Sequence, residues 1–319
     1  MTLLPEHPRH THAVVIGAGT MGADVAIVLA RGGCRVTVTD PHADKRDRLV
    51  THVQASLEPL GLAARADRVL AVAALQEVAW SDAALVIECI PEKLAAKQAL
   101  FAQLVQLAPA HTLLASNSSS FPISAIAQGL ATQHRMLGLH FFMPAHLVPL
   151  VEVVLGPQTD PAQAERLCSY MRGCGSVPVL VKKDKPGFLA NRLQHALARE
   201  AFAMIDEGIA TPQDVDAAVR FGFGFRYLAA GPVLQRDHAG LDVHCAAAAT
   251  MYPSLSNTAE PARVLQGHVS AGRLGMKTGA GFYDWPEDRR QAERLRYDHL
   301  LQKGLALLAD ELPPLDRNL

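Results

Sequence analysis

The segment from residue 12 to residue 40 limits what this chain can fold into more than any other part of it. An apolar run at 13–16 leads into the glycine-rich turn 17–22, and an alternating run further on ends in Asp40. Strand, glycine turn, helix and a second strand with an acid at its tip make up a dinucleotide-binding β-α-β unit. The pattern predicts such a unit, and a glycine-containing turn in another α/β protein is the alternative.

Each glycine of this turn has a separate role in holding a pyrophosphate. Gly17 permits the tight turn, Gly19 has no Cβ and lets a phosphate approach the backbone, and Gly22 lets the helix pack closely on the sheet. The N–H groups at the start of the helix point at the phosphates. Asp40 is expected to accept hydrogen bonds from a ribose and to repel a 2′-phosphate, which predicts NAD over NADP. The residues predicted to bind NAD here are Gly17, Gly19, Thr20, Met21, Gly22 and Asp40.

Composition excludes several classes of protein. A net charge of −1 gives no electrostatic sign of a nucleic-acid or membrane-surface partner. The five cysteines are odd in number and form no CxxC pair, which favours a reducing compartment and predicts no metal site. The first residues do not resemble a signal peptide, and no apolar run approaches the ~18 residues that cross a bilayer. We therefore expect a soluble, cytoplasmic protein whose partner is a small-molecule substrate.

Strand and helix patterns alternate through the first half of the chain. Apolar runs predict further strands at residues 83–90, 112–117 and 136–142. Residues 69–72 fit a short strand or a turn of helix, and their periodicity does not decide between the two. In a doubly wound parallel sheet, ligands bind beyond the carboxyl ends of the strands, where Glu92, Asn117 and His140 fall.

From about residue 186 the pattern changes to helices alone. Apolar residues recur at helical spacing over 191–205, and Thr211 followed by a proline begins another helix. The charged run 182–185 marks the change, and a length of 319 residues allows two domains. The prediction is a Rossmann-type doubly wound parallel sheet in residues 1–184 followed by an all-helical domain in residues 185–319.

Ordered motifs extend over nearly the whole chain, at residues 115–120, 138–144, 149–153, 186–192, 240–242 and 275–283. In this order and spacing they resemble the L-3-hydroxyacyl-CoA dehydrogenase family, of the 3-hydroxybutyryl-CoA dehydrogenase-like kind. The family includes a gulonate-type branch, similar to lambda-crystallin, that uses free acids. The resemblance implies an NAD-dependent oxidoreductase, a place in fatty acid metabolism and a homodimer formed through the helical domain.

The resemblance also assigns roles to individual residues. His140 is then the general base, Glu152 is its partner, and Ser119 and Asn191 hydrogen-bond the reacting oxygen. A hydride leaves a secondary alcohol only if the hydroxyl proton has an acceptor, and an imidazole oriented by a carboxylate supplies one at neutral pH. Three charged residues are implied along the cofactor, namely Glu92, Lys97 and Lys277.

Each of these side chains also has a structural interpretation. A histidine beside two phenylalanines, such as His140, is often a packed core residue, and Glu152 fits an outward position on a half-exposed strand. Ser119 fits a turn or a helix cap, and Asn191 fits a polar residue in a first helical turn. Lys97 on a charged helix reads more readily as a solvated surface lysine.

Three departures from the family pattern leave the substrate open. Met143 stands where the family commonly has an asparagine that contacts the nicotinamide, and a thioether cannot make that contact in the same way. An insertion that contains Arg226 resembles the gulonate-type enzymes, and its guanidinium can pair bidentately with a carboxylate. The stretch 40–92 is short where acyl-CoA enzymes place a helical hairpin that contacts CoA, although its basic residues could meet CoA phosphates.

Three functional hypotheses follow. The first is oxidation of the secondary alcohol of an L-3-hydroxyacyl-CoA to the 3-keto product, with His140 as base assisted by Glu152. The alternative is a dehydrogenase of a free hydroxycarboxylic acid, gulonate-like, in which Arg226 binds the carboxylate. The third is a non-catalytic, crystallin-like protein that binds a nucleotide.

Overall fold

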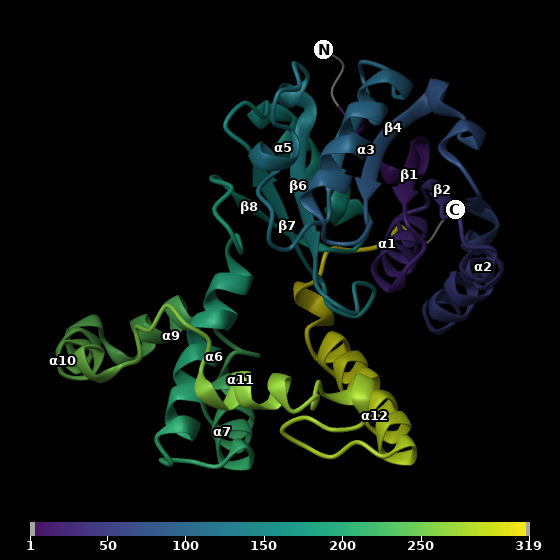
Figure 1. Ribbon diagram of the computed structural model, residues 1–319. Coiled ribbons are helices and arrows are strands. Elements are labelled where there is room, and N and C mark those ends of the chain that lie inside the picture. The colour runs from purple at the N-terminus through teal and green to yellow at the C-terminus, as the bar shows by residue number, and fades with distance from the viewer. Residues whose placement is uncertain (1–3, 317–319) are drawn as a thin grey trace. The chain divides into compact units, whose positions relative to one another are not determined.

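The computed structural model describes residues 4–316, which form two compact units (Figure 1). The N-terminal unit contains residues 4–191 and 309–316, and the helical unit contains residues 192–308. The connecting residues 185–191 therefore group with the sheet, and the described C-terminal residues return to it.

One mixed sheet forms the centre of the N-terminal unit. Its strands are β1 (His12–Ile16), β2 (Arg35–Thr39), β3 (Val69–Val72), β4 (Ala83–Glu88), β5 (Leu113–Ser116), β6 (Met136–Phe141), β7 (Leu150–Leu155) and β8 (Val177–Val181). They lie side by side in the order β3-β2-β1-β4-β5-β6-β7-β8, and every neighbouring pair is parallel except β6 and β7. The predicted Rossmann-type fold is confirmed.

Helices cover both faces of this sheet. They are α1 (Thr20–Arg31), α2 (Ala43–Leu57), α3 (Leu94–Leu107), α4 (Ile123–Ile126) and α5 (Pro161–Gly173). Because side chains alternate along a strand, Ala13 and Val15 of β1 join the core formed with α1, α2 and α5. Val14 and Ile16 join the second core, formed with α3 and α4. This two-sided burial explains why the central strands are mostly apolar on both faces.

The structure resolves one open assignment and adds elements that the sequence did not predict. Residues 69–72 are strand β3, which pairs in parallel with β2. Strand β8 and helix α5 were not predicted, and β7 was considered only as a half-exposed strand around Glu152. Glu152 interrupts the apolar pattern of β7, and Pro178 interrupts that of β8, which lies at the sheet edge where a proline is tolerated.

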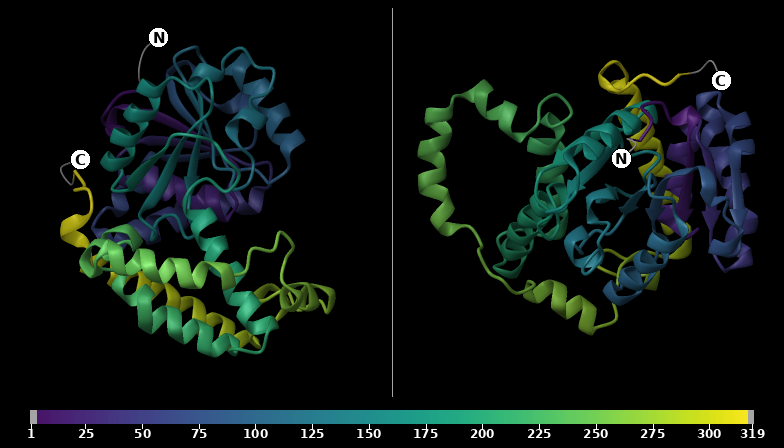
Figure 2. Two further views of the ribbon diagram at one scale, coloured as in Figure 1. Left: turned by 90° about the vertical axis from the view of Figure 1, so that its left-hand side faces the viewer. Right: turned by 90° about the horizontal axis from the view of Figure 1, so that it is seen from above.

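Helix α6 (Ala190–Asp206) leads into the helical unit, which is shown from two further sides in Figure 2. The other helices of this unit are α7 (Pro212–Ala218), α8 (Gly224–Arg226), α9 (Pro232–Ala239), α10 (Leu241–Met251), α11 (Arg263–Ser270) and α12 (Glu287–Leu307). The predicted cap of α7 is confirmed, since the Thr211 hydroxyl accepts from the Asp214 N–H at 3.2 Å. Within residues 4–316 no helix is both long and apolar enough to cross a bilayer.

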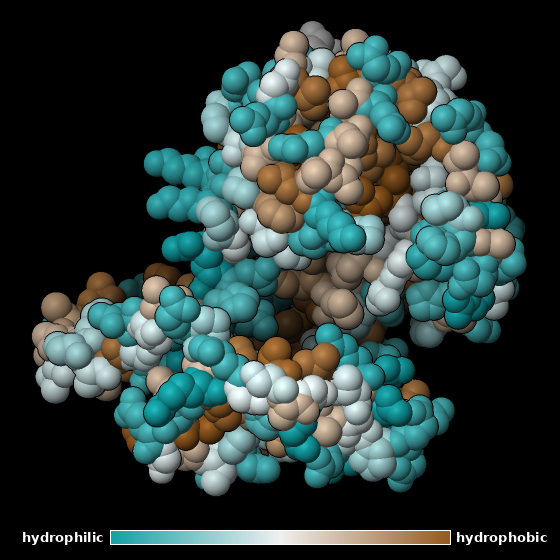
Figure 3. All heavy atoms as spheres, viewed as in Figure 1, coloured by the Kyte–Doolittle hydropathy of each residue, from teal (hydrophilic) through white to brown (hydrophobic). Residues whose placement is uncertain are grey.

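The helical unit buries very little of its apolar surface. Among the described residues, Ala230 is the one buried hydrophobic residue of this unit, whereas the N-terminal unit contains two large apolar cores. Phe221, Val233 and Tyr252 are 74%, 79% and 70% exposed. Figure 3 shows hydrophobic atoms at the surface over α10. A single copy of this unit therefore lacks the core that normally stabilises packed helices.

Candidate active site

His140 and Glu152 lie directly opposite each other on the antiparallel strands β6 and β7. The imidazole Nδ1 donates to Glu152 Oε2 at 2.7 Å, and the two residues are 3% and 0% exposed. The half-exposed position considered for Glu152 is therefore wrong. Burial alone would raise the pKa of Glu152, but the hydrogen bonds from His140 and from the Ala190 and Leu189 N–H groups lower it overall. The carboxylate is held ionised beside the imidazole.

His140 lines a cavity of about 310 Å³ within the N-terminal unit. The cavity collects predicted residues from separate elements, namely Met21, Glu92, Lys97, Ser119, His140 and Asn191. Met143 also lines it, so a thioether does occupy the wall where the family commonly has an amide. Cys89 is a further lining residue, and because burial raises the pKa of its thiol, this group is neutral and not a nucleophile. Lys97 also lines this cavity, which argues against its interpretation as a solvated surface lysine.

Lys97 is in fact 1% exposed, so its interpretation as a surface lysine is wrong. Its ammonium lies 2.6 Å from Glu88 Oε1 and 3.2 Å from Glu92 Oε2. Glu88 is completely buried at the end of β4 and also accepts from the Ser116 hydroxyl at 2.6 Å and the Ile90 N–H at 2.8 Å. Sequence reasoning missed Glu88, although an acid inside an otherwise apolar strand was a usable signal.

The serines at 118–120 divide into two roles. Glu92 accepts from the hydroxyls of Ser118 at 2.5 Å and Ser120 at 2.7 Å. Partial burial raises the pKa of Glu92, but these bonds and the charge of Lys97 lower it to about 2. Ser118 and Ser120 therefore fix the loop, whereas Ser119 lines the cavity.

Asp40 fixes the glycine turn. One carboxylate oxygen accepts from the Ala18 N–H at 2.9 Å, and the other accepts from the His42 N–H at 2.9 Å. Burial raises the pKa of Asp40, but these bonds lower it overall, so the acid is ionised at the end of β2. A carboxylate at this position fits the ribose of a dinucleotide.

The turn itself fits a pyrophosphate. A Cβ on Gly22 would lie 1.7 Å from the Gly17 carbonyl oxygen, so this close approach requires glycine. A Cβ on Gly19 would meet nothing within 4 Å, which leaves open space at the N-terminus of α1. Backbone N–H groups that face such a space are suited to binding phosphate oxygens.

Two predicted site residues belong to the helical unit. The cavity beside His140 is formed without Lys277 and Arg226. Arg226 is exposed, and its Nε and Nη1 lie 2.9 Å from the side-chain amide of Gln235. Within residues 4–316 no carboxylate pairs with this guanidinium. The contact of Arg226 with a substrate carboxylate and that of Lys277 with the cofactor both stay predictions.

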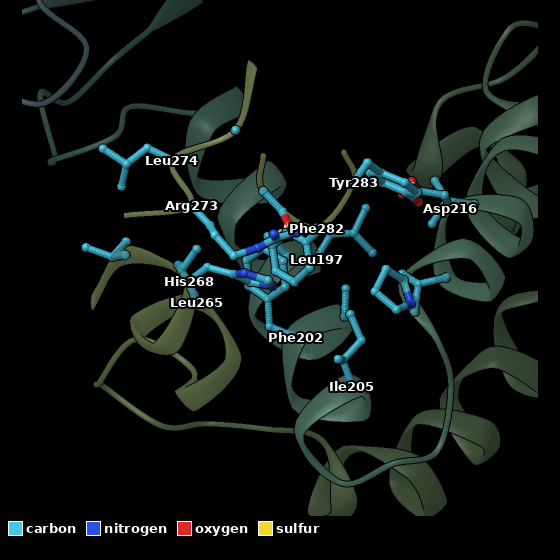
Figure 4. Close-up of a pocket in the computed structure, with 18 of the residues that line it drawn as sticks. Leu197, Phe202, Ile205, Asp216, Leu265, His268, Arg273, Leu274, Phe282 and Tyr283 are labelled. Carbon is cyan, nitrogen blue, oxygen red and sulfur yellow. Dashed lines mark hydrogen bonds between the residues drawn. The ribbon is translucent and has the colours of Figure 1, made fainter. Parts of the chain in front are cut away.

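Lys277 lines a separate cavity of about 660 Å³ in the helical unit, shown in Figure 4. The rings of Phe202 and Phe282 stack there at 5.4 Å, and the Tyr283 hydroxyl donates to Asp216 at 2.6 Å. The wall is mostly apolar and comes from α6, α7, α11 and the segment 273–285.

Comparisons with known proteins identify relatives over nearly the whole chain. The family model for the 3-hydroxyacyl-CoA dehydrogenase NAD binding domain matches residues 12–185, and that for the C-terminal domain matches residues 187–285. The chain is 36% identical over 290 residues to 5-formyl-3-hydroxy-2-methylpyridine 4-carboxylate 5-dehydrogenase of Mesorhizobium japonicum, covering 88% of this chain and 94% of the relative. It is 37% identical over 286 residues to 3-hydroxyadipyl-CoA dehydrogenase of Escherichia coli, covering 86% of this chain and 59% of that longer relative.

A solved structure is similar throughout. The crystal structure of a 5-formyl-3-hydroxy-2-methylpyridine 4-carboxylic acid 5-dehydrogenase, described as an NAD⁺-dependent dismutase, aligns with a TM-score of 0.87 and 30% identity. The alignment covers 93% of this chain and 98% of that structure. The likeness therefore includes both units.

The buried pair of Lys97 and Glu88 generates a test of stability. Lys97→Met would leave a buried carboxylate without its cation, and we expect the free energy of unfolding to fall by about 3–5 kcal/mol. Adding Glu88→Gln removes the unpaired charge and is expected to restore more than half of the loss. Urea unfolding measures both, and Lys93→Met, at an exposed lysine nearby, is the control. Equal losses in the single and double variants would contradict this account of the pair.

Proposed function

This chain belongs to the 3-hydroxyacyl-CoA dehydrogenase family and is an NAD-dependent dehydrogenase, and from that premise we propose that His140 is its general base. The observation that carries the proposal is the buried His140–Glu152 hydrogen bond at a cavity that also contains Ser119 and Asn191. Since the relatives are dehydrogenases, the non-catalytic hypothesis is set aside.

In this proposal each nitrogen of the imidazole has its own task. Nδ1 is engaged by Glu152, which leaves Nε2 to take the proton from the substrate hydroxyl. The ionised Glu152 stabilises the imidazolium that forms. Ser119 and Asn191 supply polar groups for the reacting oxygen. Bound NAD supplies the acceptor for the hydride that leaves the same carbon.

Met21 links the proposed cofactor turn to this cavity. Met21 lies in the first turn of α1, beside the proposed pyrophosphate site, and also lines the cavity of His140. We therefore assign the turn 17–22 to the pyrophosphate and Asp40 to the ribose. Glu92 and Lys97 then lie at the nicotinamide end, where Met143 offers an apolar surface to the ring.

We propose a free hydroxycarboxylic acid as the substrate. Residues 43–82 contain one α-helix, α2, followed by short turns and β3, and not the helical hairpin expected of enzymes that bind CoA. The relative from Mesorhizobium japonicum and the similar solved structure are both named for a pyridine carboxylate. The guanidinium of Arg226, which contacts the Gln235 side-chain amide and no carboxylate within residues 4–316, supplies a group suited to a carboxylate.

An L-3-hydroxyacyl-CoA is the second candidate. The matching family models are named for such thioesters, as is the relative from Escherichia coli. Helix α2 also carries the basic residues Lys45, Arg46 and Arg48, which are suited to CoA phosphates.

A substrate panel separates the two candidates. With purified protein and NAD, we expect NADH formation with at least one free hydroxycarboxylic acid and none with L-3-hydroxybutyryl-CoA. Arg226→Met should raise the KM for that acid by about tenfold or more, because a charge-assisted hydrogen-bond pair is lost. Arg236→Met, at an exposed arginine on α9, is the control. Turnover of the thioester alone would reverse the assignment.

Substitutions in the pair test the mechanism itself. His140→Ala removes the proton acceptor and is expected to lower kcat roughly 10²–10⁴-fold, with the affinity for NAD nearly unchanged. Glu152→Gln should lower kcat less, because the imidazole remains in place but loses its charged partner. Steady-state kinetics and NADH-binding fluorescence measure the two effects, and His111→Ala, at an exposed histidine, is the control. Wild-type turnover in His140→Ala would disprove the role of this residue.

We also propose that two copies of the chain complete the core of the helical unit. Two observations support the proposal: the exposed apolar side chains of this unit, and its single buried hydrophobic residue among those described. Light scattering should give about twice the chain mass of 34.2 kDa, and the midpoint of thermal unfolding should rise with protein concentration. A folded monomer at micromolar concentration, with a midpoint independent of concentration, would exclude this arrangement.

A further inference from the structure

Residues 187–190, directly before and at the start of α6, have an unusual backbone. Gly187 and Phe188 both have left-handed backbone angles, with φ of 76° and 48°. Phe188 is the one non-glycine residue with positive φ in the part of the chain that the structure describes. Because an L-residue disfavours this conformation, its surroundings must hold it in place.

The turn directs two successive N–H groups at one oxygen atom. The Leu189 and Ala190 N–H groups donate to Glu152 Oε1 at 3.0 and 2.8 Å, while Oε2 accepts from His140. The Phe188 N–H is engaged elsewhere, with the Lys185 carbonyl at 2.9 Å. Within residues 4–316 these three donors, one imidazole and two backbone groups, are the hydrogen-bond partners of the Glu152 carboxylate.

The side chain of Phe188 contacts the other member of the pair. Its ring is 5% exposed and lies with its centroid 5.6 Å from that of His140. Phe142 packs against the same imidazole at 4.6 Å. Glycine would adopt the observed φ more easily, so the phenylalanine is explained by what its ring covers.

We propose that residues 187–190 are a positioning element, here named the backbone clamp, that holds Glu152 and thereby His140 in the geometry needed for proton transfer. The proposal rests on the function assigned to His140 above. Without the clamp, Oε1 would be a buried anionic oxygen with no donor, which is costly and would favour another orientation of the carboxylate. The start of α6 also adds the favourable end of the helix dipole.

The clamp also bears on the charge of Glu152. Its N–H groups help to keep the pKa of this carboxyl below the ordinary value. Losing one of them would raise the pKa toward or above that value, so that Glu152 would take up a proton at higher pH. A protonated Glu152 cannot stabilise an imidazolium, and the acid side of the activity profile should report this change.

Ala190→Pro removes one clamp N–H with little other change. Ala190 is the first residue of α6, a position at which proline is well tolerated. We expect kcat to fall about tenfold or more, the KM for NAD to change less than twofold, and the acid limb of kcat against pH to move to higher pH. The matched control is Ala43→Pro, the same substitution at the exposed first residue of α2, which should leave kcat and the pH profile unchanged.

Phe188→Gly tests the ring and remains informative if the proline variant does not fold. It keeps both N–H groups and relieves the unfavourable φ, but it removes a buried ring, so the midpoint of thermal unfolding should fall; assayed below that midpoint, kcat should fall severalfold. Wild-type kcat and pH profile in a folded Ala190→Pro protein, or wild-type kcat in Phe188→Gly, would overturn the clamp. His140→Ala, assayed in parallel, separates failure of the clamp from failure of the proposed function. If His140 is the base, this variant is inactive whether or not the clamp exists.

Discussion

The arrangement of the site depends on one antiparallel pairing in an otherwise parallel sheet. Parallel strands need a crossover connection, whereas the antiparallel strands β6 and β7 bring residues twelve apart directly opposite each other. His140 and Glu152 occupy such a pair. Because side chains alternate between the faces of a strand, a slip of one residue in this register would turn Glu152 away from the imidazole. The position of His140, the proposed base, is therefore set by strand register.

Buried charge organises the same edge of the sheet. Glu88 and Glu152 are completely buried, and each carboxylate is compensated by one basic side chain together with backbone or hydroxyl donors. Asp40 follows the same rule with the Ala18 and His42 N–H groups. Since an unpaired buried carboxylate is strongly unfavourable, these bonds fix the loops that carry them. The loops at the carboxyl ends of the strands are thus held in place by the groups that form the cavity.

The sequence allowed most of the sheet and the glycine turn to be predicted, because continuous apolar runs and required glycines are local signals. It could not show that Lys97 is buried, because that depends on Glu88, which reaches the lysine only once β4 and α3 have packed. Nor could it separate Ser119 from Ser118 and Ser120, which have the same chemistry and differ in the fold, where the latter two donate to Glu92 and Ser119 lines the cavity. Strand β7 was considered only as a half-exposed strand, because the acidic Glu152 interrupts its apolar pattern.

Helix α6 contributes both to the surroundings of Glu152 and to the apolar cavity of the helical unit. Its first residue contributes an N–H group to Glu152, and further along the same 17-residue helix Leu197 and Phe202 line the apolar cavity of the helical unit. Helices in proteins owe most of their stability to the packing of an apolar face, yet among the described residues none of α6 is buried in a single copy of the chain. The apolar side chains of α6 therefore belong to the surface that we propose a second copy of the chain covers.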